Sequence, residues 1–159
     1  MELHIKKILV PIDFSVNSKS ALKIATQFGS FFSAELVLIH VIEPMFYPPD
    51  FSLGQITLPS MDTKEIEERA KEELTKLSQT EIQTRLRSKV IIKNGKPFHE
   101  IIETAKEEDV DLIIISSHGH SGVEQIIFGS TSEKVVRKSP CPVLTLRDPL
   151  KGFDYKELM

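Results

Sequence analysis

The 159-residue chain has little cysteine, no excess of positive charge and no long apolar run. Its single cysteine, Cys141, excludes an intramolecular disulfide and argues against a cysteine-based zinc site. The 20 basic and 23 acidic side chains give a net charge of -3, which argues against bulk electrostatic binding of nucleic acid. No apolar run approaches the roughly 20 residues that a membrane-spanning helix needs. We therefore expect neither nucleic acid nor a membrane as a partner.

The first residues carry no recognisable export signal. The apolar run from Ile8 to Ile12 is too short for one and ends at an acidic residue, Asp13. We therefore expect a cytoplasmic protein. The length predicts one domain, and the 40% hydrophobic and 27% charged residues are an ordinary globular balance. We place this domain at residues 1–148 and treat 149–159 as a polar C-terminal tail.

Two kinds of segment alternate along the chain. Short runs of aliphatic, often β-branched residues predict strands buried on both faces, at 5–12, 35–41, 90–93, 112–115 and 143–146. Apolar residues at helical spacing predict helices between them, at 18–32, at 61–82, from Pro97 and from Ser130. This alternation predicts an α/β fold in which helices cover both faces of a mostly parallel sheet.

Two local features concern loops and helix starts. Asp62 with Glu65, and Ser130 with Glu133, have the spacing of a capping box, which predicts where two helices begin. The segment 43–60 is rich in proline and aromatic residues and shows no periodicity. A connection this long is either functional, such as a lid over a site, or an idle surface loop.

Ligands of open α/β sheets bind beyond the carboxyl ends of the strands. The first strand is followed by Pro11-Ile12-Asp13, with neither a G-x-G-x-x-G nor a P-loop pattern. The Asp13 carboxylate is placed to accept hydrogen bonds from a ribose hydroxyl or to hold a hydrated Mg²⁺. The alternative is that Asp13 only caps the helix that follows.

The loop after the fourth strand carries the strongest functional signal. It contains Ser116-Ser117-His118-Gly119-His120-Ser121-Gly122 and, after an apolar turn, Gly129-Ser130-Thr131. Glycines permit positive φ angles and a close approach of a ligand to the backbone. Free N–H groups of such a loop and of a helix N-terminus bind anions, so this region is suited to a triphosphate without any lysine. The alternative is that the glycines serve only tight turns.

Three histidines, His40, His118 and His120, and the single cysteine, Cys141, do not complete a known catalytic pattern. His118 and His120 lack a third metal ligand, and no G-x-S-x-G elbow is present. His40 lies within a predicted strand, where we expect a core or pocket-edge residue. Cys141, between two prolines, is interpreted as structural.

Three segments together resemble the universal stress protein family: KKILVPIDFS, DLIIISSHGHSG and FGSTSEKVVRKSPCPVL. The resemblance covers nearly the whole chain. It implies a Rossmann-like, open, doubly wound fold with five parallel strands and helices on both faces. It also implies a homodimer that pairs through the last strand, Val143 to Leu146, which would hide an exposed sheet edge.

The ATP-binding members of this family carry a G-x2-G-x9-G-[S/T] motif after the fourth strand. Gly119 and the Gly129-Ser130 pair fit this motif, whereas Ser116 replaces its first glycine. The resemblance implies that Asp13 contacts the ribose and that the backbone at Ile12 and Val41 meets the adenine. It also implies that Gly119, His120, Gly129, Ser130 and Thr131 surround the phosphates. Asp13 is the candidate metal ligand, through Mg²⁺ bound with ATP. The remaining predicted cofactor-binding residues are Pro11, Ser116 and Gly122.

These observations favour an ATP-binding, homodimeric stress or signalling protein that acts as a switch on a protein partner not yet identified. No general base is evident, so we expect slow hydrolysis or none. The alternative is a homodimeric interaction module of the same fold that binds no nucleotide, and Ser116 is its best support. A phosphohydrolase or nucleotidyltransferase on this scaffold is the least favoured reading.

Overall fold

The computed structural model describes residues 4–44, 63–82, 85–117 and 129–147. Each expected strand and helix is present in these ranges, with ends that differ from the predicted ones by a few residues. The strands are β1 (Lys7–Pro11), β2 (Glu35–Ile42), β3 (Ser88–Asn94), β4 (Leu112–Ser116) and β5 (Val143–Leu146). The helices are α1 (Val16–Phe32), α2 (Thr63–Glu81), α3 (Pro97–Glu107) and α4 (Ser130–Lys138).

Several predictions fall on residues outside these ranges. They are the role of segment 43–60 as a lid or an idle loop, which falls almost entirely on undescribed residues, the start of the second helix at Asp62, the loop residues Gly119, His120 and Gly122, and the tail 149–159.

The five strands form one parallel sheet in the order β3-β2-β1-β4-β5. The chain winds outward from β1 through β2 to β3 and then returns to the other side of β1 to add β4 and β5. The direction of winding therefore reverses between β1 and β4, as in a doubly wound α/β domain. The predicted fold class is confirmed.

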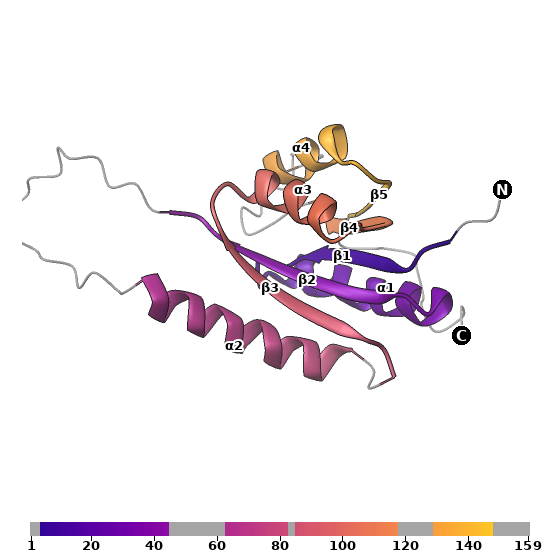
Figure 1. Ribbon diagram of the computed structural model, residues 1–159, viewed down its shortest axis with the longest axis horizontal. Coiled ribbons are helices and arrows are strands. Elements are labelled where there is room, and N and C mark those ends of the chain that lie inside the picture. Colours follow the sequence, from indigo (N-terminus) through magenta and orange to yellow (C-terminus); the bar gives the residue numbers. More distant parts are fainter. Residues whose placement is uncertain (1–3, 45–62, 83–84, 118–128, 148–159) are drawn as a thin grey trace, which may run out of the picture.

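Helices cover both faces of the sheet, α1 and α2 on one face and α3 and α4 on the other (Figure 1). Successive residues of β1 point to opposite faces, because side chains alternate along a strand. Ile8 and Val10 pack in the cluster that contains Leu22 of α1, whereas Leu9 packs in the cluster that contains Val135 of α4. All of these side chains are completely buried, which explains the continuous apolar runs in the sequence.

The carboxyl ends of β1 and β4 diverge. Pairing between them ends at Leu9 and Ile113, whereas pairing of β1 with β2 continues to Pro11 and Ile39. The N–H of Ile12 donates to the Ile39 carbonyl over 2.8 Å, so by alternation the backbone nitrogen of residue 11 faces β4. Proline has no N–H to donate there. Pro11 therefore stops the ladder with β4 and leaves a gap at the switch point.

Within the described part of the chain, no helix combines the length and apolar character that a bilayer crossing requires.

Candidate functional site

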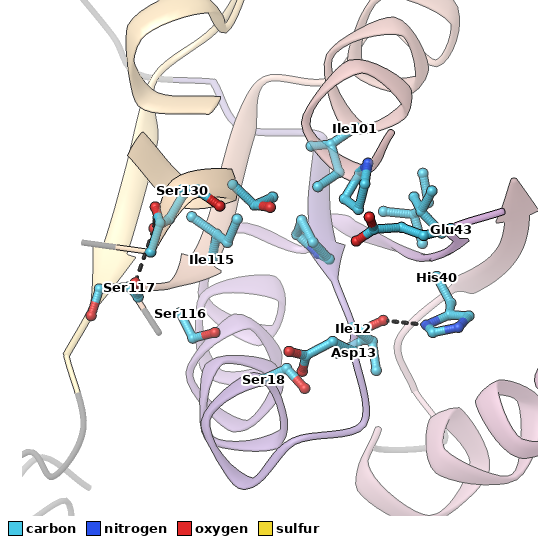
Figure 2. A pocket seen from close by; sticks show the side chains of 17 residues that line it. Ile12, Asp13, Ser18, His40, Glu43, Ile101, Ile115, Ser116, Ser117 and Ser130 are labelled. Carbon is cyan, nitrogen blue, oxygen red and sulfur yellow. Dashed lines mark hydrogen bonds between the residues drawn. The ribbon is translucent and has the colours of Figure 1, made fainter. Parts of the chain in front are cut away.

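A pocket of about 350 Å³ lies at the carboxyl edge of the sheet, over the gap between β1 and β4 (Figure 2). Its wall is built from the ends of β1, β2 and β4 and from the first turns of α1, α3 and α4. Every predicted site residue that the structure describes lies in this wall. These residues are Pro11, Ile12, Asp13, Val41, Ser116, Gly129, Ser130 and Thr131.

The wall also contains residues that were not predicted as site residues. Glu43 and Ser117 follow β2 and β4, so the rule that ligands bind after parallel strands would have found them. Pro97 and Ile101 come from the start of α3, and their place in the wall depends on how that helix packs. His40 lies at the pocket edge, one of the two positions expected for it. The wall residues outside the predicted site are Ser18, Ile39, His40, Glu43, Pro97, Ile101, Ile115, Ser117 and Ser132.

Asp13 does not cap α1. The N-cap is Ser15, whose side-chain oxygen accepts a hydrogen bond from the N–H of Ser18 over 3.1 Å. Asp13 Oδ1 instead accepts from the N–H and the hydroxyl of Ser15, at 3.0 and 2.5 Å. The Asp13 side chain thus braces the turn before α1, and Figure 2 shows it beside Ser18 in the pocket. The helix-cap alternative for Asp13 is wrong.

The N-terminus of α4 opens into the pocket, but it is not built as predicted. Gly129 is the N-cap and makes no side-chain cap hydrogen bond, and Ser130 is the first helical residue. The Ser130–Glu133 capping box is therefore wrong, and Glu133 instead lies 3.6 Å from Arg137. Because the N-cap residue supplies no side-chain acceptor, the described part of the chain leaves N–H groups of the first turn available to a ligand.

The backbone around Gly129 is anchored to the end of β4. The N–H of Gly129 donates to the Ser117 carbonyl over 2.7 Å, and the Ser132 hydroxyl donates to the same carbonyl over 3.0 Å. The φ angle of Gly129 is -69°, which any residue adopts. The expected need for a positive φ is therefore wrong at this position.

The charge of the described wall is unusual for a site suited to an anion. It contains two carboxylates, of Asp13 and Glu43, together with serine and threonine hydroxyls, and neither lysine nor arginine. Across the residues that the structure describes, no group of three or more histidine, cysteine, aspartate or glutamate side chains is arranged to hold a metal ion. Recognition of an anion by these wall residues therefore depends on neutral N–H and O–H donors.

An open parallel sheet with a pocket at its switch point defines a doubly wound α/β domain, a class in which ligands bind at that position. The family model described as "Universal stress protein family" matches residues 4–147. Universal stress protein YxiE of Bacillus subtilis is 34% identical over 145 residues, covering 89% of this chain and 98% of the relative. Universal stress protein MJ0577 of Methanocaldococcus jannaschii is 33% identical over 159 residues, covering 92% and 98%. The chain belongs to the universal stress protein family.

Solved structures agree with this assignment. Universal stress protein UspA from Lactobacillus plantarum matches with a TM-score of 0.74 at 25% identity, over 92% of this chain and 100% of that one. Two structures below 25% identity, each covering 91% of this chain and 98% of the other, share the fold. One is a universal stress protein in complex with cAMP (TM-score 0.63, 19% identity). The other is the Archaeoglobus fulgidus protein in complex with dAMP (TM-score 0.62, 18% identity).

Proposed function

We propose that this protein binds ATP in the pocket at the switch point and acts as a regulatory switch with slow hydrolysis or none. The observation that carries the proposal is that one pocket joins a carboxylate, Asp13, to the uncapped N-terminus of α4. A carboxylate suits ribose hydroxyls, and a helix N-terminus suits phosphates. The adenine nucleotides bound by proteins of the same fold support this class of ligand.

The pocket wall orients the nucleotide in this proposal. The phosphates lie at Gly129, Ser130 and Thr131, where N–H and hydroxyl donors meet. The ribose lies at Asp13, and the base lies toward the end of β2 at Val41. The N–H of Ile12 is already bonded to Ile39, so Ile12 contributes apolar contact to the base. Gly119, His120 and Gly122 complete the phosphate side in this proposal.

Mg²⁺ fits this site as part of the nucleotide complex. Asp13 supplies a hard oxygen ligand of the kind that Mg²⁺ prefers, and phosphates and water supply the others. The ion would reduce the repulsion between the phosphates and the carboxylates of Asp13 and Glu43. Asp13 is therefore the residue that we assign to both the ribose and the metal complex.

The second part of the proposal is a homodimer through β5. This strand ends the sheet, next to β4, and its residues Val143–Leu146 are all partly exposed. A second copy paired along this edge would satisfy the outward N–H and C=O groups of the strand. The α4 helix precedes β5 in the chain. Nucleotide bound beside α4 would then lie close to the dimer surface, which a partner protein could bind.

Calorimetry of nucleotide-stripped protein with Mg-ATP tests the binding. We expect saturable binding by the unaltered protein and a loss of about tenfold to hundredfold in affinity for Asp13→Asn, because a charged acceptor of ribose hydroxyls is lost. Asp109→Asn is the matched control, since Asp109 is exposed and lies outside the pocket wall. Absence of binding at millimolar Mg-ATP contradicts the proposal.

Ser116 favours a second candidate, an interaction module that binds no nucleotide, because the side chain lies in the pocket wall where the motif has glycine. Two variants separate the readings. If ATP binds, Ser116→Gly keeps or improves the affinity, and a similar loss in Ser116→Gly and Ser116→Ala identifies the hydroxyl as a ligand. If the Ser116→Gly variant binds ATP and the unaltered protein does not, the second candidate is correct.

A further inference from the structure

The turn that carries Asp13 is fastened to β2 by the side chain of His40. His40 Nδ1 lies 2.7 Å from the carbonyl oxygen of Ile12. A carbonyl oxygen only accepts hydrogen bonds, so Nδ1 carries the proton and donates. The N–H of Ile12 donates to the carbonyl of Ile39. Two successive residues of β2 therefore hold Ile12, one through its backbone and the other through its side chain.

His40 also contacts the residue that follows Asp13. The rings of His40 and Phe14 lie 4.7 Å apart between centroids, with 43° between their planes. Phe14 has a φ angle of +64°, in the left-handed region that non-glycine residues seldom occupy. Such a conformation persists only where the surroundings hold it. The imidazole of His40 thus contacts the chain on both sides of Asp13.

Asp13 depends on the shape of this turn for its direction. Its Oδ1 atom accepts two hydrogen bonds from Ser15, on the far side of Phe14. Figure 2 shows the Asp13 carboxylate directed toward Ser18, whereas the His40 ring lies on the opposite side of Ile12. His40 is therefore placed to act on the Asp13 carboxylate through the backbone of the turn.

We propose that His40 is a positioning residue, which holds residues 12–15 in the conformation that presents the Asp13 carboxylate to the ribose hydroxyls of a bound nucleotide. The inference rests on the proposed function, because it assumes that Asp13 meets the ribose. It explains why a histidine at the end of a strand uses its Nδ1 proton on a backbone carbonyl and its ring face on Phe14.

The test compares two ligands, Mg-ATP and Mg-2′,3′-dideoxy-ATP, which lacks the ribose hydroxyls. His40→Leu removes the donor to Ile12. We expect this variant to bind ATP about tenfold more weakly but to bind the dideoxy nucleotide only about threefold more weakly, because that nucleotide shares the base and Mg²⁺ contacts and has no ribose hydroxyls to lose. His40→Asn keeps a donor nitrogen close to the position of Nδ1, so we expect ATP affinity within about threefold of the original.

Two controls separate positioning from a loss of folding. His99→Leu makes the same substitution on the exposed side of α3, where the ring is 60% exposed and outside the pocket wall, and leaves both affinities unchanged. In an Asp13→Ala background, His40→Leu changes ATP affinity by less than about twofold, because the group that it positions is gone. Thermal midpoints of all variants identify any that do not fold.

Each outcome decides between readings. Selective loss of ATP affinity in His40→Leu, with recovery in His40→Asn, supports the inference. An equal loss for both nucleotides, or no loss for either, overturns it while the proposed function stands. If His40→Leu does not fold, His40→Asn and His40→Gln replace it, and the inference requires the glutamine variant to lose ATP selectively. If the unaltered protein binds neither nucleotide, the proposed function fails, and this inference fails with it.

Discussion

The amino and carboxyl edges of the sheet differ in which charged residues they carry and in what those residues contact. At the amino edge, Asp111 Oδ2 accepts from the N–H groups of Lys6 and Lys7, at 2.7 and 2.9 Å. Glu108 lies 2.6 Å from the ammonium of Lys89 and 3.7 Å from that of Lys7. At the carboxyl edge, the described pocket wall has carboxylates and hydroxyls but no lysine or arginine.

In our proposal, the charged residues of the amino edge stabilise the fold, whereas those of the carboxyl edge contact a ligand. Lys7 is the first residue of β1 and Lys89 the second residue of β3, and Glu108 lies close to both ammonium groups, so this edge contributes to stability. At the carboxyl edge, the N-terminus of α4 and the carboxylates of Asp13 and Glu43 line a pocket. Substitutions at the amino edge should therefore change the free energy of unfolding, whereas those at the carboxyl edge should change ligand affinity.

The largest effect is expected for Gly129→Val. A branched side chain at this N-cap enters the space that we assign to the phosphates. We expect ATP affinity to fall about hundredfold, equivalent to about 2.7 kcal/mol, with a loss of stability of at most about 1 kcal/mol. Calorimetry and urea unfolding measure the two quantities. Gly129→Ala should give an intermediate loss of affinity, and unchanged affinity in both variants would remove the phosphates from this position.

At the opposite edge, Asp111→Ala should destabilise the protein without affecting the ligand. The substitution leaves two backbone N–H groups without their carboxylate acceptor, which costs about 2 kcal/mol. Urea unfolding measures the change, and Asp109→Asn, at an exposed position nearby, should stay within about 0.5 kcal/mol. A weaker affinity for ATP in Asp111→Ala would break the separation between the two edges.

Thr104→Val tests a position that belongs to neither edge. Thr104 on α3 is completely buried, and no hydrogen-bond partner is found for its hydroxyl oxygen in the described structure. Burying a hydroxyl without a hydrogen bond costs free energy, and an apolar group of the same shape avoids this cost. We therefore expect the free energy of unfolding to stay level or to rise by about 1 kcal/mol. The control is Thr75→Val on α2, where the hydroxyl donates to the Lys71 carbonyl and no gain is expected. A loss above about 1 kcal/mol in Thr104→Val would show that its hydroxyl is bonded.

The smallest effect is expected for Glu108→Gln. The hydrogen bond from Lys89 is the main reason that the pKa of the Glu108 carboxyl lies below its usual value, which means that folding favours the charged form. Its contribution to stability is therefore present above the ordinary carboxyl pKa and is lost as pH falls through the lowered value. We expect Glu108→Gln to cost about 0.5 kcal/mol at neutral pH and nothing in strong acid. Urea titrations across this range measure the difference, and a constant difference would contradict the assignment.

The strands and the edge that holds the pocket were predictable because their signals are strong. Leu36–Ile39 is almost completely buried, so its pattern could only be continuous and apolar. Asp13 and Ser116 were found because ligands of parallel sheets bind where strands end. The start of α4 at Ser130 was predicted, but its N-cap was not predictable from spacing. Contacts of Gly129 and Ser132 with Ser117, distant in sequence, set the N-cap one residue earlier.

The part of the wall from α3 was missed for a similar reason. Pro97 and Ile101 reach the pocket because β3 pairs with β2 in a particular register, which ends at Ile42 and Asn94, and because α3 then crosses the sheet. No local pattern encodes that register. The Phe14–His40 contact likewise joins two segments whose separate sequences give no sign of it.

The wall draws on five separated stretches of the chain, near residues 11–18, 39–43, 97–101, 115–117 and 129–132. A fragment that lacks any of these stretches lacks part of the wall, so a ligand in this pocket would bind the folded domain and not the unfolded chain. Occupancy is then coupled to global unfolding: ligand at a hundred times its dissociation constant adds about 2.7 kcal/mol. If the pocket binds a ligand as we propose, the melting temperature of the protein would therefore rise with the concentration of that ligand.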